Sequence, residues 1–320
     1  MAPGPGAEVV AATAHPFGVR GALELARLAR EAKPDLVHCP HFPTPASIHV
    51  PLVVTLHDLA PLLVPGVMPS AAKRAVYRRW NARAVRLADR VVVPSRATAA
   101  DVERLFPAAR NKLEVIAEAV DDFSDGPIGP LSGAVAHLAS QPYLLSMGNT
   151  KLHKDLPTLL LAFSELAHSI PDLRLLLVGA EPSGYLDAGP AGVAAETRSR
   201  VAFTGRVDDT ELRALYAGAA AFVFPSQYEG FGLPPLEAMA SGTPVIVSNS
   251  SSIPEVVGDA GLLVDPFDQA AIRDAMLRLI DDKALCATLA ARGIDRARGF
   301  SWARCASTTR EVYERVLSER

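Results

Sequence analysis

Short runs rich in β-branched residues alternate with longer helical patterns along almost the whole chain of 320 residues. This alternation is typical of strand–helix–strand units, in which helices cover both faces of a parallel sheet. We therefore predict an α/β protein built on parallel sheets. In the first half the expected strands are Glu8–Ala12, Asp35–Cys39, Leu52–Leu56, Arg90–Val93 and Leu113–Ile116. In the second half they are Tyr143–Met147, Leu173–Val178, Val201–Thr204, Ala220–Phe224, Pro244–Val247 and Leu262–Val264.

A segment rich in glycine and proline divides this pattern into two. Gly126-Pro127 and Gly129-Pro130 are typical of a linker, and 320 residues are enough for two domains. We predict a Rossmann-like first domain over 1–125, a linker over 126–142, a second domain over 143–300 and a last helix within 301–320. Two such sheets in tandem place a cleft at the carboxyl ends of their strands, where open α/β sheets bind ligands.

Composition excludes several classes of protein. The formal charge of −3 argues against a general nucleic-acid binder, so no nucleic-acid partner is expected. Three scattered cysteines do not form a disulfide framework or a cysteine-rich zinc site. The start of the chain lacks the basic and apolar regions of a signal peptide, and no stretch is apolar enough to span a bilayer. We expect a cytoplasmic protein that meets a membrane from one side only.

Several motifs of well-known chemistries are absent from the sequence. We find no Gly-x-Gly-x-x-Gly after the first strand, no P-loop, no Asp-x-Asp, no His-Glu-x-x-His and no Gly-x-Ser-x-Gly. The sequence therefore lacks the main evidence for a dinucleotide oxidoreductase, a P-loop kinase or a metal-dependent enzyme. We expect no cofactor and no metal.

The chemistry of the second half centres on one loop, within Phe222-Val-Phe-Pro-Ser-Gln-Tyr-Glu-Gly-Phe-Gly-Leu-Pro-Pro-Leu-Glu237. Gly230 and Gly232 let backbone N–H groups approach a ligand, and the start of the following helix is an anion site. Glu229 and Glu237 each offer two oxygens to a pair of vicinal sugar hydroxyls. The alternative interpretation is a buried strand, a tight turn and a helix whose glutamate favours the N-terminal dipole.

With this setting, the chain resembles the family 4 retaining glycosyltransferases, which have the GT-B fold of two Rossmann-like domains facing a cleft. The resemblance extends from about Lys33 to the C-terminus. Further matching segments are Lys33-Pro-Asp-Leu-Val-His, Val53-Val-Thr-Leu-His-Asp-Leu, Tyr143-Leu-Leu-Ser-Met-Gly-Asn-Thr-Lys-Leu-His-Lys, Thr204-Gly-Arg-Val, Gly242-Thr-Pro-Val-Ile, Pro254-Glu-Val-Val-Gly and Ala260-Gly-Leu-Leu-Val-Asp-Pro. The resemblance implies transfer of a hexose from a nucleoside diphosphate sugar to an acceptor hydroxyl, and a last helix that crosses back onto the first domain.

The resemblance also implies roles for individual residues. Glu229 matches the carboxylate on the transferred sugar, Glu237 the one on the nucleotide ribose, and Lys154 the cation on the diphosphate. His57 matches the histidine near the sugar and the leaving phosphate. The loop whose amides meet the sugar and diphosphate corresponds to Gly230, Phe231, Gly232 and Leu233, and the backbone that frames the base to Arg206 and Val207. Glu229, His57 and Lys154 are the catalytic candidates.

The diphosphate loop departs from the family pattern. Asn149 stands at one position where the family has arginine, and Lys151 and His153 are the candidates for a second donor. Fixed cations and amides lower the barrier because the departing diphosphate gains charge in the transition state. Alternatively, Lys151 and Lys154 are solvated surface charges and His57 is a partly buried structural histidine.

The first domain is also short, and Met-Ala-Pro-Gly-Pro-Gly does not replace the family's N-terminal strand and glycine-rich loop. The main hypothesis is a retaining hexosyltransferase that uses GDP-mannose or UDP-glucose and a saccharide or lipid-linked acceptor. An inactive nucleotide-sugar-binding protein and a GT-B sugar-nucleotide epimerase are the alternatives. The motifs specify neither the base, the hexose, the acceptor nor the oligomeric state.

A basic helical segment over 71–90 is the remaining feature. Its single acidic residue is Asp89, and its basic residues are Lys73, Arg74, Arg78, Arg79, Arg83, Arg86 and Arg90. Its apolar residues at helical spacing are Val76, Trp80, Ala84 and Leu87. Such a helix is able to lie on an anionic membrane, which here is the inner face of the cell membrane. The alternative is an apolar stripe packed on the sheet beneath a solvated outer face.

Overall fold

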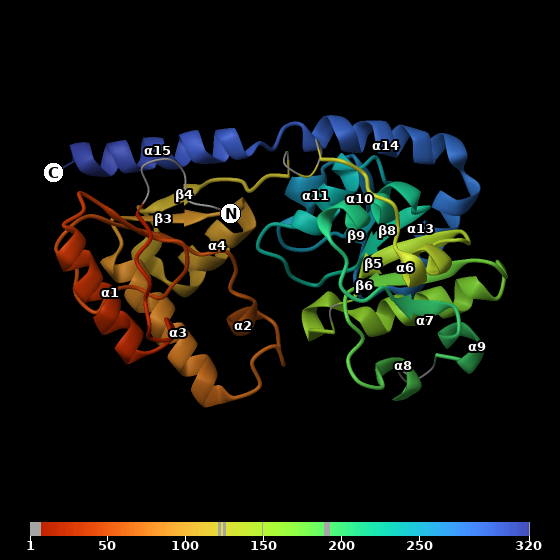
Figure 1. Ribbon diagram of the computed structural model, residues 1–320, viewed down its shortest axis with the longest axis horizontal. Coiled ribbons are helices and arrows are strands. Elements are labelled where there is room, and N and C mark those ends of the chain that lie inside the picture. Colours follow the sequence, from red (N-terminus) through yellow and green to blue (C-terminus); the bar gives the residue numbers. More distant parts are fainter. Residues whose placement is uncertain (1–7, 121–122, 124–125, 149, 189–192, 320) are drawn as a thin grey trace.

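The computed structural model describes residues 8–120, 123, 126–148, 150–188 and 193–319. Two α/β units lie side by side, each around a parallel sheet, and the long helices at the end of the chain run along both of them (Figure 1). This arrangement confirms the predicted α/β class with two parallel sheets.

The first sheet has four parallel strands in the order β1-β2-β3-β4. They are β1 (Val37–Cys39), β2 (Leu52–Thr55), β3 (Arg90–Val93) and β4 (Leu113–Val115). Their helices are α1 (Val19–Ala32), α2 (Ala60–Leu63), α3 (Ala71–Leu87), α4 (Arg96–Leu105) and the 3-10 turn η1 (Pro107–Ala109). The predicted strand Glu8–Ala12 is wrong: Val9 and Val10 are 73% and 58% exposed, and without a neighbour to pack against the apolar run forms no strand.

The second sheet has six parallel strands in the order β10-β9-β8-β5-β6-β7. They are β5 (Tyr143–Met147), β6 (Arg174–Val178), β7 (Val201–Phe203), β8 (Ala221–Phe224), β9 (Val245–Ser248) and β10 (Gly261–Val264). All six lie within one residue of their predicted bounds. The order reverses between β5 and β8, and at such a switch point the loops after the two strands open a crevice for a ligand.

Helices cover both faces of the second sheet and bury two apolar layers. They are α6 (Gly133–Leu138), η2 (Leu152–Lys154), α7 (Leu156–Ala167), α8 (Tyr185–Ala188), α9 (Ala195–Arg198), α10 (Asp209–Gly218), α11 (Leu233–Ala240), α12 (Ile253–Val257), α13 (Gln269–Asp281) and α14 (Lys283–Ala297). Helix α6 lies inside the segment predicted as a linker, and its Val135 is buried in the same layer as Phe222 and Leu236.

The chain passes between the two domains twice. The first passage follows β4, and Val120 and Phe123 already pack in the core of the second domain. The second passage follows α14, and α15 (Trp302–Ser318) then lies on the first sheet, where Val312 and Val316 are buried (Figure 1). The last helix thus crosses back onto the first domain.

Helix α3 carries the predicted basic face, but its apolar side is already used. Trp80, Ala84 and Leu87 pack in the core of the first domain, whereas Val76 is 55% exposed. The Arg83 guanidinium donates to Thr44 Oγ1 and to the carbonyls of Pro45 and Ala46, so this charge ties α3 to a loop. Among the described residues no helix is both long and apolar enough to cross a bilayer.

Candidate functional site

The glycine loop, residues 225–232, connects β8 to α11 at the carboxyl edge of the second sheet. Gly232 has φ 119°, a conformation that favours glycine, and it turns the chain into α11 with Pro234 and Pro235 in the first turn. Hydroxyl groups from the start of α12 fix the loop: Ser251 Oγ donates to Glu229 O at 2.5 Å and Ser252 Oγ to Phe231 O at 2.6 Å. No side chain of the described residues caps α11. Because Pro234 and Pro235 have no N–H, the Leu233 N–H is the amide that its first turn offers to a ligand.

Lys154 and Glu229 form an ion pair beside this loop. Lys154 Nζ donates to Glu229 Oε1 at 2.5 Å and lies 4.9 Å from the centroid of the Phe224 ring. The two side chains are only 15% and 13% exposed. They are 75 residues apart in sequence and meet because β5 and β8 are neighbours at the switch point. The structure therefore brings two of the predicted catalytic residues together.

A cavity of about 450 Å³, the loop cavity, opens between the domains at this ion pair. It is lined by Asp58, Ala60 and Gly66 of the first domain and, among the predicted residues, by Lys151, His153, Glu229 and Gly230. His153 is buried, and its Nδ1 has no hydrogen-bond partner within the described part of the chain. Burial and the neighbouring Lys154 charge lower the pKa of His153, so the neutral ring presents Nδ1 to a ligand group.

His57 lies next to the glycine loop, but protein groups hold both of its ring nitrogens. Its Nδ1 is 2.8 Å from Glu118 Oε1 and its Nε2 is 3.0 Å from the carbonyl oxygen of Pro40. The hydrogen bond to Glu118 raises the pKa of His57, because both partners are acceptors and favour the imidazolium. The motifs missed Glu118, although its place just after β4, at the carboxyl edge of a parallel strand, is a signal for a site residue.

The remaining predicted residues lie around the same edge of the second sheet. Glu237 sits on α11, and its Oε2 accepts a hydrogen bond from Tyr216 at 3.1 Å. Arg206 is exposed in the loop after β7, while Val207 packs on the core. Phe231 is buried, Leu233 opens α11, and Asn149 lies outside the described residues.

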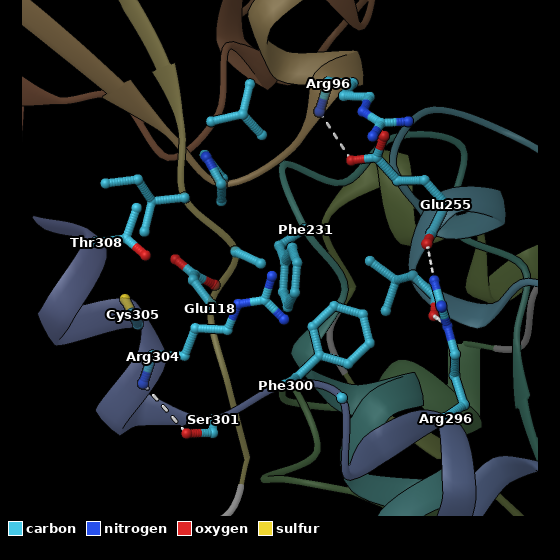
Figure 2. A pocket seen from close by; sticks show the side chains of 16 residues that line it. Arg96, Glu118, Phe231, Glu255, Arg296, Phe300, Ser301, Arg304, Cys305 and Thr308 are labelled. Carbon is cyan, nitrogen blue, oxygen red and sulfur yellow. Dashed lines mark hydrogen bonds between the residues drawn. The ribbon is translucent and has the colours of Figure 1, made fainter.

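An interdomain bridge divides the cleft. Ser95 Oγ and Thr98 Oγ1, at the start of α4, both donate to the Gly230 carbonyl, at 2.7 and 3.0 Å. Tyr228 donates to Asp101 Oδ2 at 3.0 Å. Ser95 also caps α4, because its Oγ accepts from Thr98 N at 3.0 Å. Beyond the bridge a second cavity, of about 600 Å³, opens toward α15 (Figure 2).

Within the part of the chain that the structure describes, no three His, Cys, Asp or Glu side chains gather as a metal site requires. The loop cavity is lined instead by the charged side chains of Asp58, Lys151 and Glu229 and by the neutral ring of His153. Independence from metal stays a prediction.

Two parallel-sheet domains that face a cleft, with a glycine loop at the switch point of the second, define a protein of the GT-B class. The model described as glycosyl transferases group 1 matches residues 133–296, and the one described as Glycosyltransferase Family 4 matches residues 3–122. The chain belongs to family 4 of the glycosyltransferases and is a glycosyltransferase.

Named relatives agree with this assignment. The chain is 33% identical over 289 residues to O-antigen chain mannosyltransferase B of Escherichia coli, covering 89% of this chain and 75% of that protein. It is 31% identical over 295 residues to MMP alpha-(1->4)-mannosyltransferase of Mycolicibacterium hassiacum, covering 85% of this chain and 67% of that protein. Among solved structures, sucrose-phosphate synthase from Thermosynechococcus elongatus is similar, with a TM-score of 0.75, 25% identity and coverage of 93% of this chain and 78% of that one.

Proposed function

We propose that the protein is a retaining hexosyltransferase that transfers mannose from GDP-mannose to a saccharide or lipid-linked acceptor. The observation that carries this proposal is the Lys154–Glu229 pair, 2.5 Å long, beside a glycine loop whose helix start is uncapped. A cation and a backbone N–H at the start of α11, that of Leu233, suit a diphosphate, and a carboxylate suits sugar hydroxyls. The names of the two relatives above favour mannose over the glucose of UDP-glucose.

In the proposed reaction the diphosphate lies between Lys154 and the Leu233 N–H at the start of α11. Charge that develops on the departing phosphate is stabilised there by fixed donors, without a divalent ion. Glu229 accepts hydrogen bonds from the transferred sugar, and Glu237, held by Tyr216, accepts them from the ribose. The glycosidic bond to phosphate breaks as the acceptor oxygen attacks from the same face, and the acceptor proton passes to the departing phosphate oxygen.

The proposal is tested by binding and turnover together. We expect GDP-mannose to bind in calorimetry more tightly than UDP-glucose. Lys154→Ala and Glu237→Ala should each weaken the binding of GDP-mannose about tenfold or more, because each removes a charged partner worth about 1.5–3 kcal/mol. Lys283→Ala, on an exposed residue at the start of α14, is the control and should bind normally. If both site variants bind like the wild type, the donor site is misplaced.

Product analysis separates the other hypotheses. The transferase releases nucleotide only when an acceptor is glycosylated, keeps the donor's anomeric configuration by NMR, and stays active in excess EDTA. Binding without turnover would instead identify an inactive nucleotide-sugar-binding protein. Free nucleotide with an epimerised sugar in the absence of acceptor would identify an epimerase.

We also propose a purely electrostatic contact between α3 and an anionic membrane. The exposed basic residues of this helix are Lys73, Arg74, Arg78, Arg79 and Arg86. Each adds about 1 kcal/mol of attraction near an anionic surface. Reversing four of these charges should abolish sedimentation with phosphatidylserine liposomes, and unchanged binding would refute the contact.

A further inference from the structure

The cavity beyond the interdomain bridge, the hinge cavity, lies where the chain passes between the domains. Its walls come from the ends of β3 and β4, the start of α4, helix α12 and the junction of α14 with α15 (Figure 2). The glycine loop separates it from the loop cavity, since Gly230 lines one and Phe231 the other. The volume of about 600 Å³ is within the range of small-molecule sites.

Two arginines of the hinge cavity have no side-chain partner among the residues that the structure describes. Arg96 stands at the start of α4 and Arg304 in the first turn of α15, and both are exposed. Among the described residues, neither guanidinium makes a hydrogen bond or an ion pair; only their backbone N–H groups do, to Glu255 and Ser301. Figure 2 shows the Arg304 side chain reaching from α15 into the cavity.

A third arginine of the cavity behaves differently. Arg296 donates to the carbonyl oxygens of Val256 and Glu255, at 2.8 and 2.5 Å, and lies over the Phe300 ring. Arg296 thus has a structural role that explains its presence. Among the described residues the side chains of Arg96 and Arg304 have no such role, and a guanidinium group suits a phosphate.

The rest of the lining suits a sugar. The carboxylates of Glu118 and Glu255 accept hydrogen bonds and so match hydroxyl groups. Phe231 and Phe300, edge to face with centroids 5.7 Å apart, provide an apolar wall for the face of a ring. A simple inorganic anion would make no use of this aromatic wall.

We propose that the hinge cavity is a second ligand site that binds a phosphorylated sugar, with the phosphate on Arg96 and Arg304 and the hydroxyls on Glu118 and Glu255. This site is separate from the donor site and does not depend on the function proposed above. It is nonetheless coupled to the loop cavity. Glu118 holds His57 Nδ1 at 2.8 Å, and the His57 carbonyl lies directly against Gly230.

Calorimetry on the full chain tests the site with mannose 6-phosphate as the probe. We expect the sugar phosphate to bind, and mannose and inorganic phosphate each to bind at least tenfold more weakly. Arg304→Gln should weaken mannose 6-phosphate at least tenfold. Arg310→Gln, six residues further along α15 and paired with Glu314, is the matched control and should leave binding unchanged.

The location is decided by a second comparison. Lys154→Ala should leave binding of mannose 6-phosphate unchanged even where it weakens the nucleotide sugar. A probe whose binding is weakened by Lys154→Ala and not by Arg304→Gln occupies the loop cavity, which overturns the proposal. No binding to the wild type at about 10 mM also overturns it. Equal binding of inorganic phosphate overturns the sugar part.

Circular dichroism checks that each variant is folded. If Arg304→Gln is unfolded, Arg96→Gln carries the same test from the other domain. Saturation of the cavity should also change the affinity for the nucleotide sugar about fivefold or more, with a reciprocal change for mannose 6-phosphate.

Discussion

Gly230 of the second domain packs directly against the backbone of His57 in the first domain. A Cβ built there would lie 1.8 Å from the carbonyl oxygen of His57 and 3.0 Å from Cβ of Asp58. Because the glycine is buried and the first clash is with backbone, no side-chain rotation relieves it. Gly230→Ala must therefore push the two domains apart by roughly 1 Å at the loop.

The cost of this separation follows from the interdomain bridge. A shift of this size breaks the hydrogen bonds from Ser95 and Thr98 to the Gly230 carbonyl, now 2.7 and 3.0 Å long. At about 1 kcal/mol for each bond, the closed arrangement loses about 2 kcal/mol. The ratio of closed to open molecules then falls roughly 30-fold, and kcat/KM should fall by up to this factor.

The effect is measured as kcat/KM and as hydrogen exchange of the peptides around 95–99 and 226–236. We expect faster exchange in both peptides and an unchanged far-ultraviolet spectrum. Gly18→Ala is the control, since a Cβ there meets only His15 O at 3.9 Å. If Gly230→Ala keeps kcat/KM within about twofold of the wild type, the close approach is not needed for activity and the reasoning fails.

Three further predictions follow from the site and its surroundings. Because Glu118 raises the pKa of His57, this pair stabilises the fold fully below the ordinary histidine pKa of about 6.5, and the stabilisation is lost as the pH rises through the raised pKa. Glu118→Gln should therefore lower Tm more at about pH 6 than at about pH 9. An equal loss of Tm at both pH values would contradict this. Tyr216→Phe removes the hydroxyl that donates to Glu237 and should weaken nucleotide-sugar binding about fivefold in calorimetry. The variant should remain folded, so that the number of binding sites per chain is unchanged. Burial raises the pKa of Cys39 to about 11, so mass spectrometry should find its alkylation by iodoacetamide much slower than in urea.

The sequence predicts the sheets well because their strands are buried on both faces. Leu144, Leu145, Phe222 and Val223 are fully buried, and such continuous apolar runs are clear without knowledge of their partners. Glu8–Ala12 has a similar run without a neighbour in the fold, so local pattern alone misleads there. Helices such as α8, α9 and α12 span only four or five residues, too few to show a helical period.

Some features of the candidate site follow from the local sequence, whereas others depend on contacts between residues far apart in the chain. The cap at Ser95 and the turn at Gly232 follow from local chemistry and are present. The contact of Lys154 with Glu229 depends on strand order, which family resemblance implies and periodicity does not. The role of Ser95 on Gly230, 135 residues away, and that of Glu118 on His57 depend on how two domains meet, and no local pattern encodes that.

The double passage of the chain has a mechanical consequence. Both connections, after β4 and after α14, lie on the same side of the cleft, and α15 anchors one of them to the first sheet through Val312 and Val316. Two neighbouring connections resist twisting of one domain against the other but permit rotation about the line that joins them. The two domains are therefore expected to open and close by a hinge rotation about that line. Substrates would then enter from the side of the cleft opposite the two connections. A molecule bound near these connections would limit how far the two domains rotate apart.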